Sequence, residues 1–294
     1  MTEIGTDPVA RAAALGCFTD PTDIVPLGGG ITNVNLRVTD GAATFVVRLG
    51  SDIPEHGVMR WNELEISRAA HALGVAPKVV HHEPGALVLE FIDARTFGEE
   101  DVCAPKNLPR IVDLLKTTHT GLGAHLTTPV LTFWPYQVNR TYVTRLLAGG
   151  SPHTSKLSGL MAEQDKLIAA TGPVDLVIGH NDLLAANILD DGTRLWLIDW
   201  EYGGYNTTLF DLAGLAGNNG LTETQEREML TRYFAADPDR HWRPYQAMKC
   251  ASLMRETLWS MTSELHSEID FDYTAYTAEN LARLEAALTD FHNT

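Results

Sequence analysis

One short stretch near the middle of the chain constrains its structure most. It places Asp182 and Asn187 five residues apart, and Asp199 follows Asn187 twelve residues later. A strand pattern at 175–178 leads into this segment, and an apolar run at 195–198 ends directly before Asp199, which predicts a strand–loop–strand unit. Lone Asp and Asn residues are usually turn or cap residues. Three of them in register within one such unit favour a functional site instead.

The types and order of these residues suit phosphoryl transfer. A carboxylate at Asp182 can orient a substrate hydroxyl and accept its proton, while an Asn amide and a second carboxylate hold the magnesium ions that bridge nucleotide phosphates. The protein-kinase template reads H-R-D-x-x-x-x-N followed by D-F-G, and this chain reads H-N-D-x-x-x-x-N followed by D-W-E. We therefore predict Asp182, Asn187 and Asp199 as catalytic residues, the last two as metal ligands.

Composition limits the partners that such a chain can have. Its 294 residues include 22 basic and 38 acidic side chains, and the net charge of −16 argues against nucleic acid or an anionic membrane surface. Cys17, Cys103 and Cys250 lie far apart and match no metal-ligand spacing, which predicts reduced thiols in the cytoplasm. No signal-peptide pattern and no run of membrane-spanning length is expected. A homodimer is left open.

Hydrophobic patterning divides the chain into a strand-rich and a helix-rich part. After a helix around 9–15, strands are predicted at 24–27, 33–38, 44–49 and 86–92. One helix interrupts them, over 59–73, and stops at Gly74. Helices dominate the rest, near 105–120, 136–148, 155–169, 208–217, 223–235, 242–266 and 274–290. The predicted domains are 1–93, a nucleotide-binding lobe, and 94–294, a catalytic and substrate-binding lobe.

Several segments together resemble the choline/ethanolamine kinase family, a branch of the aminoglycoside-phosphotransferase-like kinases. They run in the family's order over nearly the whole chain, at 28–33, 60–63, 74–77, 180–187, 198–206, 210–213 and 271–276. The most specific is D-W-E-Y-x-x-Y-N-x-x-x-F-D-L-A, because other kinases of the superfamily rarely continue past the metal Asp in this way. The resemblance implies an α+β, two-lobed, protein-kinase-like fold with a small antiparallel β-rich N-lobe and a large, mostly helical C-lobe.

The resemblance also implies an ATP site in the N-lobe. The glycines at 28–30 alone indicate a hairpin turn, but the following residues match the family's phosphate loop, G-G-x-T-N. Arg48 stands where kinases need a cation for the phosphates, and family spacing selects Glu63 rather than Glu65 as its partner. Main-chain groups of the hinge would bind adenine. The predicted ATP-binding residues are Gly29, Gly30, Thr32, Asn33, Arg48, Glu63, Glu90 and Ile92.

Family spacing places the acceptor site in the C-terminal helices. Quaternary ammonium groups bind to aromatic faces, and Trp259 and Tyr276 match the family's choline cage, although helical aromatics are more often core residues. Glu256 stands where eukaryotic relatives carry a second Trp, and its carboxylate suits a primary ammonium group. Glu201, which follows Asp199, is expected to support metal or substrate. The predicted substrate-binding residues are thus Glu201, Glu256, Trp259 and Tyr276.

Two further polar residues match family positions with structural roles. Asp211, in the F-D-L-A segment, is expected to fix the catalytic loop. His119 is expected to form structural hydrogen bonds at a helix end.

The sequence therefore predicts an ATP- and Mg²⁺-dependent kinase whose substrate is a small cationic amino alcohol of the choline or ethanolamine type. One alternative is another small-molecule kinase of the superfamily, acting on an aminoglycoside, thiamine or an amino sugar. A second alternative is a catalytically silent kinase-fold binding protein. The presence of Asp182, Asn187 and Asp199 argues against it, because loss of one of these residues is the simplest way for a kinase to lose its activity.

Overall fold

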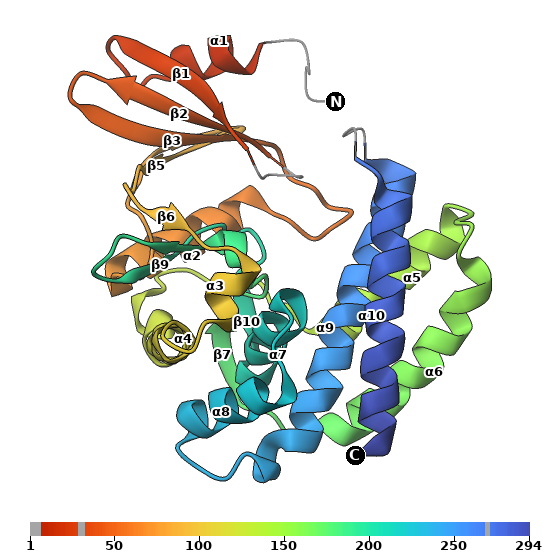
Figure 1. The fold of residues 1–294 in the computed structure, drawn as a ribbon. Helices are drawn as coiled ribbons and strands as arrows, with labels where there is room; N and C mark the ends of the chain where they lie inside the picture. Colours follow the sequence, from red (N-terminus) through yellow and green to blue (C-terminus); the bar gives the residue numbers. More distant parts are fainter. Residues whose placement is uncertain (1–6, 29–32, 268–270) are drawn as a thin grey trace.

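The N-terminal part of the protein is an antiparallel sheet. The computed structural model describes residues 7–28, 33–267 and 271–294 (Figure 1). Its five-stranded sheet has the order β1-β2-β3-β5-β4, and every neighbouring pair is antiparallel. The strands are β1 (Pro21–Leu27), β2 (Val34–Asp40), β3 (Ala43–Leu49), β4 (Val79–Glu83) and β5 (Ala86–Glu90). A short helix, α1 (Pro8–Ala13), covers one face and closes a small core around Leu36, Val47 and Val88.

One helix, α2 (Arg60–Leu73), lies between β3 and β4 in the sequence but packs against the helical part of the molecule. It ends as predicted at Gly74, whose φ of 86° is a left-handed conformation that glycine adopts without strain. Its apolar residues Ile66, Ala69 and Ala70 are buried in the larger hydrophobic cluster, together with side chains of the helical part. The helix therefore packs on the C-terminal part, and the domain boundary at residue 93 stays a prediction.

The C-terminal part is mostly helical, as predicted. Its helices are α3 (Glu99–Cys103), α4 (Leu108–Gly121), α5 (Pro135–Ala148), α6 (Thr154–Thr171), α7 (Thr208–Asn219), α8 (Glu223–Phe234), α9 (Asp239–His266) and α10 (Tyr273–Asn293), with a 3₁₀ turn, η1 (Leu122–His125). The long α9 packs against α5, α6, α7 and α10, so nearly every residue in its central stretch is buried (Figure 1). No described helix combines the length and apolar character needed to cross a membrane.

Two small sheets inside this helical part carry the predicted strand–loop–strand unit. The first pairs β7 (Leu176–Gly179) with β10 (Gly204–Thr207). The second joins β6 (Arg95–Thr96), β8 (Ile188–Asp190) and β9 (Leu195–Leu197). The loop between β7 and β8 includes a 3₁₀ turn, η2 (Ala185–Asn187). The predicted fold class, an antiparallel β-rich N-lobe and a mostly helical C-lobe, is confirmed.

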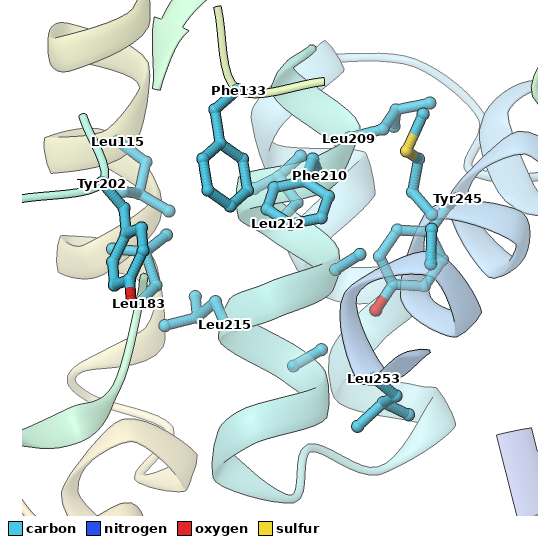
Figure 2. Close-up of a cluster of buried hydrophobic side chains, with 14 of the residues drawn as sticks. Leu115, Phe133, Leu183, Tyr202, Leu209, Phe210, Leu212, Leu215, Tyr245 and Leu253 are labelled. Carbon is cyan, nitrogen blue, oxygen red and sulfur yellow. The ribbon is translucent and has the colours of Figure 1, made fainter. Parts of the chain in front are cut away.

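The loop after β7 is anchored in the hydrophobic core by one side chain. Leu183, next to Asp182, is almost completely buried in the large cluster. Figure 2 shows it beside Tyr202 and Leu115, with Leu212 and Leu215 of α7 in the same cluster. Because the core is close-packed, this anchor leaves the neighbouring polar residues little freedom to move.

The packing of α2 on the C-terminal part leads to a stability prediction. Ile66 is 0% exposed, and Trp61 on the same helix is 47% exposed. We expect Ile66→Ala to lower the free energy of unfolding by about 3 kcal/mol, because it leaves a cavity in the large core. Trp61→Ala, the matched control, should change it by about 0.5 kcal/mol or less. Urea unfolding measures both, and equal effects would contradict this account of the packing.

Candidate active site

Asp211 of α7 holds the backbone of the loop that follows β7. Its carboxylate accepts hydrogen bonds from the backbone N–H groups of His180 and Asn181, each at 2.7 Å, and from His119 Nε2 at 2.9 Å. The other ring nitrogen of His119 lies 2.9 Å from the Tyr233 hydroxyl. Burial would raise the pKa of Asp211, but His119 and these bonds outweigh it and lower the pKa. The structural roles predicted for Asp211 and His119 are confirmed.

Asparagine side chains hold the same loop at further points. Asn181 has a φ of 68°, a left-handed conformation that is uncommon outside glycine. Its side chain donates to the Tyr202 carbonyl at 2.9 Å and accepts from Asn206 at 2.9 Å. Asn219 of α7 accepts from the backbone N–H of Ala185 at 2.8 Å. Sequence reasoning assigned no role to these asparagines, because their partners are distant in the chain.

The loop presents Asp182 in a largely buried position, with its side chain 15% exposed. Burial, together with the nearby Glu256 and Asp199 carboxylates, raises the pKa of this carboxyl to about 7. Arg255 opposes this shift and lies 2.9 Å from Asp182 Oδ1. A carboxylate with a pKa near neutrality is suited to accepting a proton.

Hydrogen bonds tie Asn187 and Asp199 into the same unit. Asn187 Nδ2 donates to the Asp182 carbonyl at 2.9 Å, and no hydrogen bond within the described part of the chain uses its amide oxygen. The backbone N–H of Ile198 donates to the Asn187 carbonyl at 3.0 Å, and the Ile198 carbonyl accepts from His180 Nε2 at 2.8 Å. Asp199 follows with a φ of 65°. Strained backbone at two such positions is typical of functional sites.

A buried ion cluster joins the sheet and α2 to Asp199. The Arg48 guanidinium of β3 lies 3.1 Å from Glu63, 2.7 Å from Asp199 and 3.4 Å from Glu201. Arg60 of α2 adds contacts at 2.6 Å to Glu63 and 3.1 Å to Glu201. The predicted Arg48–Glu63 pair is therefore present in the structure, and it extends to Asp199.

The pKa values in this cluster follow from its charges. Burial alone would lower the pKa of Arg48, but Asp199, Glu63 and Glu201 outweigh it and raise the pKa. Burial would raise the pKa of Asp199, whereas Arg48 lowers it. Burial and Asp199 together raise the pKa of Glu201 against the influence of Arg48 and Arg60. Arg48 and Asp199 are accordingly both charged at neutral pH.

The other residues predicted for the nucleotide site differ in their positions relative to the ion cluster. Asn33 donates to Glu201 at 2.9 Å and accepts from Arg60 at 2.6 Å, so it contacts the ion cluster. The strand predicted to reach Ile92 ends at Glu90, so Ile92 follows β5 outside the sheet. Gly29, Gly30 and Thr32 lie outside the described residues.

Three of the four predicted acceptor residues, Glu256, Trp259 and Tyr276, form a connected group on α9 and α10. The Tyr276 hydroxyl donates to Glu256 at 2.8 Å, and its ring meets Trp259 edge-on at 6.4 Å. Trp259 is only 4% exposed, and its Nε1 donates to the Tyr202 hydroxyl at 3.0 Å. Glu201 lies apart from this group, on the ion cluster. Next to Tyr202 is a cavity of about 200 Å³, whose lining includes Phe133, Tyr142 and Glu201.

The arrangement defines a class of protein. The protein is a protein-kinase-like phosphotransferase. It combines an antiparallel N-terminal sheet and a helical C-terminal part with the Asp182–Asn187–Asp199 unit, which faces a buried Arg–Glu pair. The family model for choline/ethanolamine kinase matches residues 24–218, and the chain belongs to this family. It is a small-molecule kinase, and the predicted family relationship is confirmed.

Individual relatives agree with this assignment. A probable ethanolamine kinase of Arabidopsis thaliana is 26% identical over 85% of this chain and 75% of its own. The crystal structure of a choline/ethanolamine kinase family protein from Mesorhizobium loti superposes with a TM-score of 0.76 at 25% identity, covering 95% of this chain and 92% of that one. A spectinomycin phosphotransferase solved with ADP and spectinomycin shares the fold, with a TM-score of 0.62 at 15% identity over 92% and 93%.

The role of Asp211 can be tested by a conservative substitution. Asp211→Asn keeps the size of the side chain but removes its charge and one acceptor oxygen, which leaves buried donors on His180, Asn181 or His119 without a partner. We expect the free energy of unfolding to fall by about 3 kcal/mol. Asp290→Asn, on an exposed position of α10, is the control and should be nearly neutral. Urea unfolding that gives equal stabilities for the two variants would contradict the role.

Proposed function

We propose that this chain transfers the γ-phosphoryl group of magnesium-bound ATP to the hydroxyl of a small amino alcohol of the ethanolamine or choline type. One observation carries the proposal. Asp182 and Asn187 share a hydrogen-bonded loop, and the same unit ends at Asp199, 2.7 Å from the buried Arg48–Glu63 pair. A proton acceptor, two oxygen ligands and a phosphate-binding cation are the parts that phosphoryl transfer needs.

The oxygen donors present fit Mg²⁺. Among the described residues no group of three or more His, Cys, Asp or Glu side chains forms a metal-binding cluster. Mg²⁺ in kinases is held by one or two protein oxygens together with substrate phosphates and water, so a closed protein cage is not required. In our proposal, Asp199 and the amide oxygen of Asn187 hold the ion. When bound, it supplies positive charge that offsets the charge of the phosphates.

Arg48 is proposed to bind the phosphates and Asp182 to handle the proton. Glu63 fixes the guanidinium of Arg48 from α2, so that its remaining donors can face phosphate oxygens. Asn33, together with Gly29, Gly30 and Thr32, would contact the phosphates. Main-chain groups of Glu90 and Ile92 would bind adenine. The ADP bound to the spectinomycin phosphotransferase of the same fold supports an adenine nucleotide.

The acceptor is proposed to bind among Glu256, Tyr276 and the neighbouring cavity. Names of relatives support an amino alcohol, since the Arabidopsis protein is described as a probable ethanolamine kinase. A carboxylate beside aromatic rings is a suitable environment for an ammonium group. Trp259 is buried behind Tyr202 and Tyr276, so we assign it to supporting the wall of this site. Glu201, at the ion cluster, is assigned to the phosphate side.

We also propose a cytoplasmic location. Cys17, Cys103 and Cys250 are all free thiols, which suits a reducing compartment. A homodimer stays a prediction.

The proposed base can be tested directly. We expect Asp182→Asn to lower kcat by roughly 10²-fold or more, because an amide cannot accept the hydroxyl proton, while the affinity for ATP changes little. The measurement is coupled turnover with ethanolamine, alongside calorimetry with ATP. Asp165→Asn, exposed on α6, is the matched control. Turnover of Asp182→Asn at the wild-type rate would remove Asp182 from the mechanism.

The metal ligands lead to a graded prediction. Asp199→Ala should weaken magnesium-dependent ATP binding by about tenfold or more, and Asn187→Ala should weaken it less, because a carboxylate neutralises the ion and an amide does not. Calorimetry with ATP at saturating Mg²⁺ measures both. Repeating the titrations in EDTA should remove the difference between the variants. Wild-type affinity in Asp199→Ala at saturating Mg²⁺ would refute the assignment.

A further inference from the structure

Arg255 of α9 lies at the centre of the proposed site, although no sequence motif singled it out. Its side chain is 5% exposed, so the charge is buried. One terminal nitrogen contacts Asp182 Oδ1 at 2.9 Å and the Asn181 carbonyl at 3.2 Å. The other donates to Glu256 Oε2 at 2.7 Å. The guanidinium therefore bridges the proposed catalytic base and the proposed acceptor carboxylate.

The same guanidinium covers aromatic rings. Its central carbon lies 5.0 Å from the centroid of Tyr202 and 5.7 Å from that of Phe133, which is cation–π distance. Ring faces of this kind are also where an ammonium group can bind. An internal cation already occupies these faces.

Glu256 holds this arrangement from the other side. Its Oε2 accepts from Arg255, and its Oε1 accepts from the Tyr276 hydroxyl at 2.8 Å. Each carboxylate oxygen has a second lone pair, so Glu256 can still accept a hydrogen bond from a substrate. Both terminal nitrogens of Arg255 already donate to carboxylates, so Arg255 is not arranged to bind an anionic acceptor.

We propose that Arg255 is a positioning and specificity-determining residue: it holds the Asp182 carboxylate in place and keeps quaternary ammonium groups off the rings of Tyr202 and Phe133. This inference rests on the proposed function, because it concerns the acceptor of the same reaction. The inference adds to the proposed function that the site prefers a primary ammonium group, as in ethanolamine, over the trimethylammonium group of choline.

The preference follows from the chemistry of the two ammonium groups. A trimethylammonium group has no donor protons and binds chiefly through aromatic faces, which Arg255 covers here. A primary ammonium is smaller and has three donors, so it can bind through the remaining lone pairs of Glu256. Positioning of Asp182 matters independently of the acceptor, because a misplaced base slows transfer to any hydroxyl.

The test compares Arg255→Met and Arg255→Lys with the wild type in turnover of ethanolamine and choline. Arg255→Met should lower kcat for ethanolamine by roughly 10²-fold, as expected for a misplaced base, with the KM for ATP within about twofold. Its ratio of kcat/KM for choline over ethanolamine should rise by about tenfold, as the ring faces open. Arg255→Lys keeps the charge but cannot bridge both carboxylates, so its values should lie between the two.

Arg243→Met is the matched control. Arg243 also lies on α9, but its guanidinium is 4.7 Å from the Phe291 ring, and within the described residues its hydrogen bonds go to Phe291 and Thr294 at the C-terminal end of the chain. Neither kcat nor the choline-to-ethanolamine ratio should change. Thermal melting and ATP calorimetry verify that each variant is folded.

The outcomes separate this inference from the proposed function. Wild-type kcat and an unchanged ratio in folded Arg255→Met would overturn the inference and leave the proposed function intact. If Arg255→Met does not fold, Arg255→Lys decides, and wild-type values in that variant overturn the inference. A wild-type chain that transfers phosphate to neither alcohol would overturn the proposed function and this inference together.

Discussion

The rest of the site depends on the ion pairs that the Arg48 guanidinium forms. The guanidinium joins β3 to Glu63 on α2 and to Asp199 at the end of the catalytic unit, at 3.1 and 2.7 Å. A buried charge is costly unless it is paired, so the sheet, the helix and the catalytic unit must meet at this point. Three carboxylates face two guanidinium groups here, and burial raises the pKa of one of them, Glu201. A cation bound beside Asp199 would offset the excess negative charge of these carboxylates.

Local patterns predicted much of the fold and of the nucleotide side. Helix α2 was predicted because its periodicity and the Gly74 stop are local signals, and the strands around Asp182 were predicted from short apolar runs. Strand β4 was missed, because its polar His81 and His82 hide the alternation of a strand. Its pairing with β5 depends on the sheet, which a local pattern does not contain.

The polar framework of the site was less predictable, because its contacts span long distances in the sequence. Asn219 holds the loop of Asp182 from α7, and Arg255 reaches the same loop from α9. One signal was available in the sequence: Arg255 and Glu256 are the only charged residues between Lys249 and Glu264 of a long predicted helix, and buried charges are nearly always paired. The environment of Trp259 also depends on a residue that is distant in the sequence, because its ring nitrogen donates a hydrogen bond to the Tyr202 hydroxyl.

The reaction that we propose for this chain is phosphorylation of the hydroxyl of a small amino alcohol. The most direct measurement is ³¹P NMR of the wild-type protein with ATP, Mg²⁺ and either ethanolamine or spectinomycin. We expect a new phosphomonoester resonance with ethanolamine, growing in step with ADP, and none with spectinomycin. Release of inorganic phosphate alone, or phosphorylation of spectinomycin in place of ethanolamine, would contradict it.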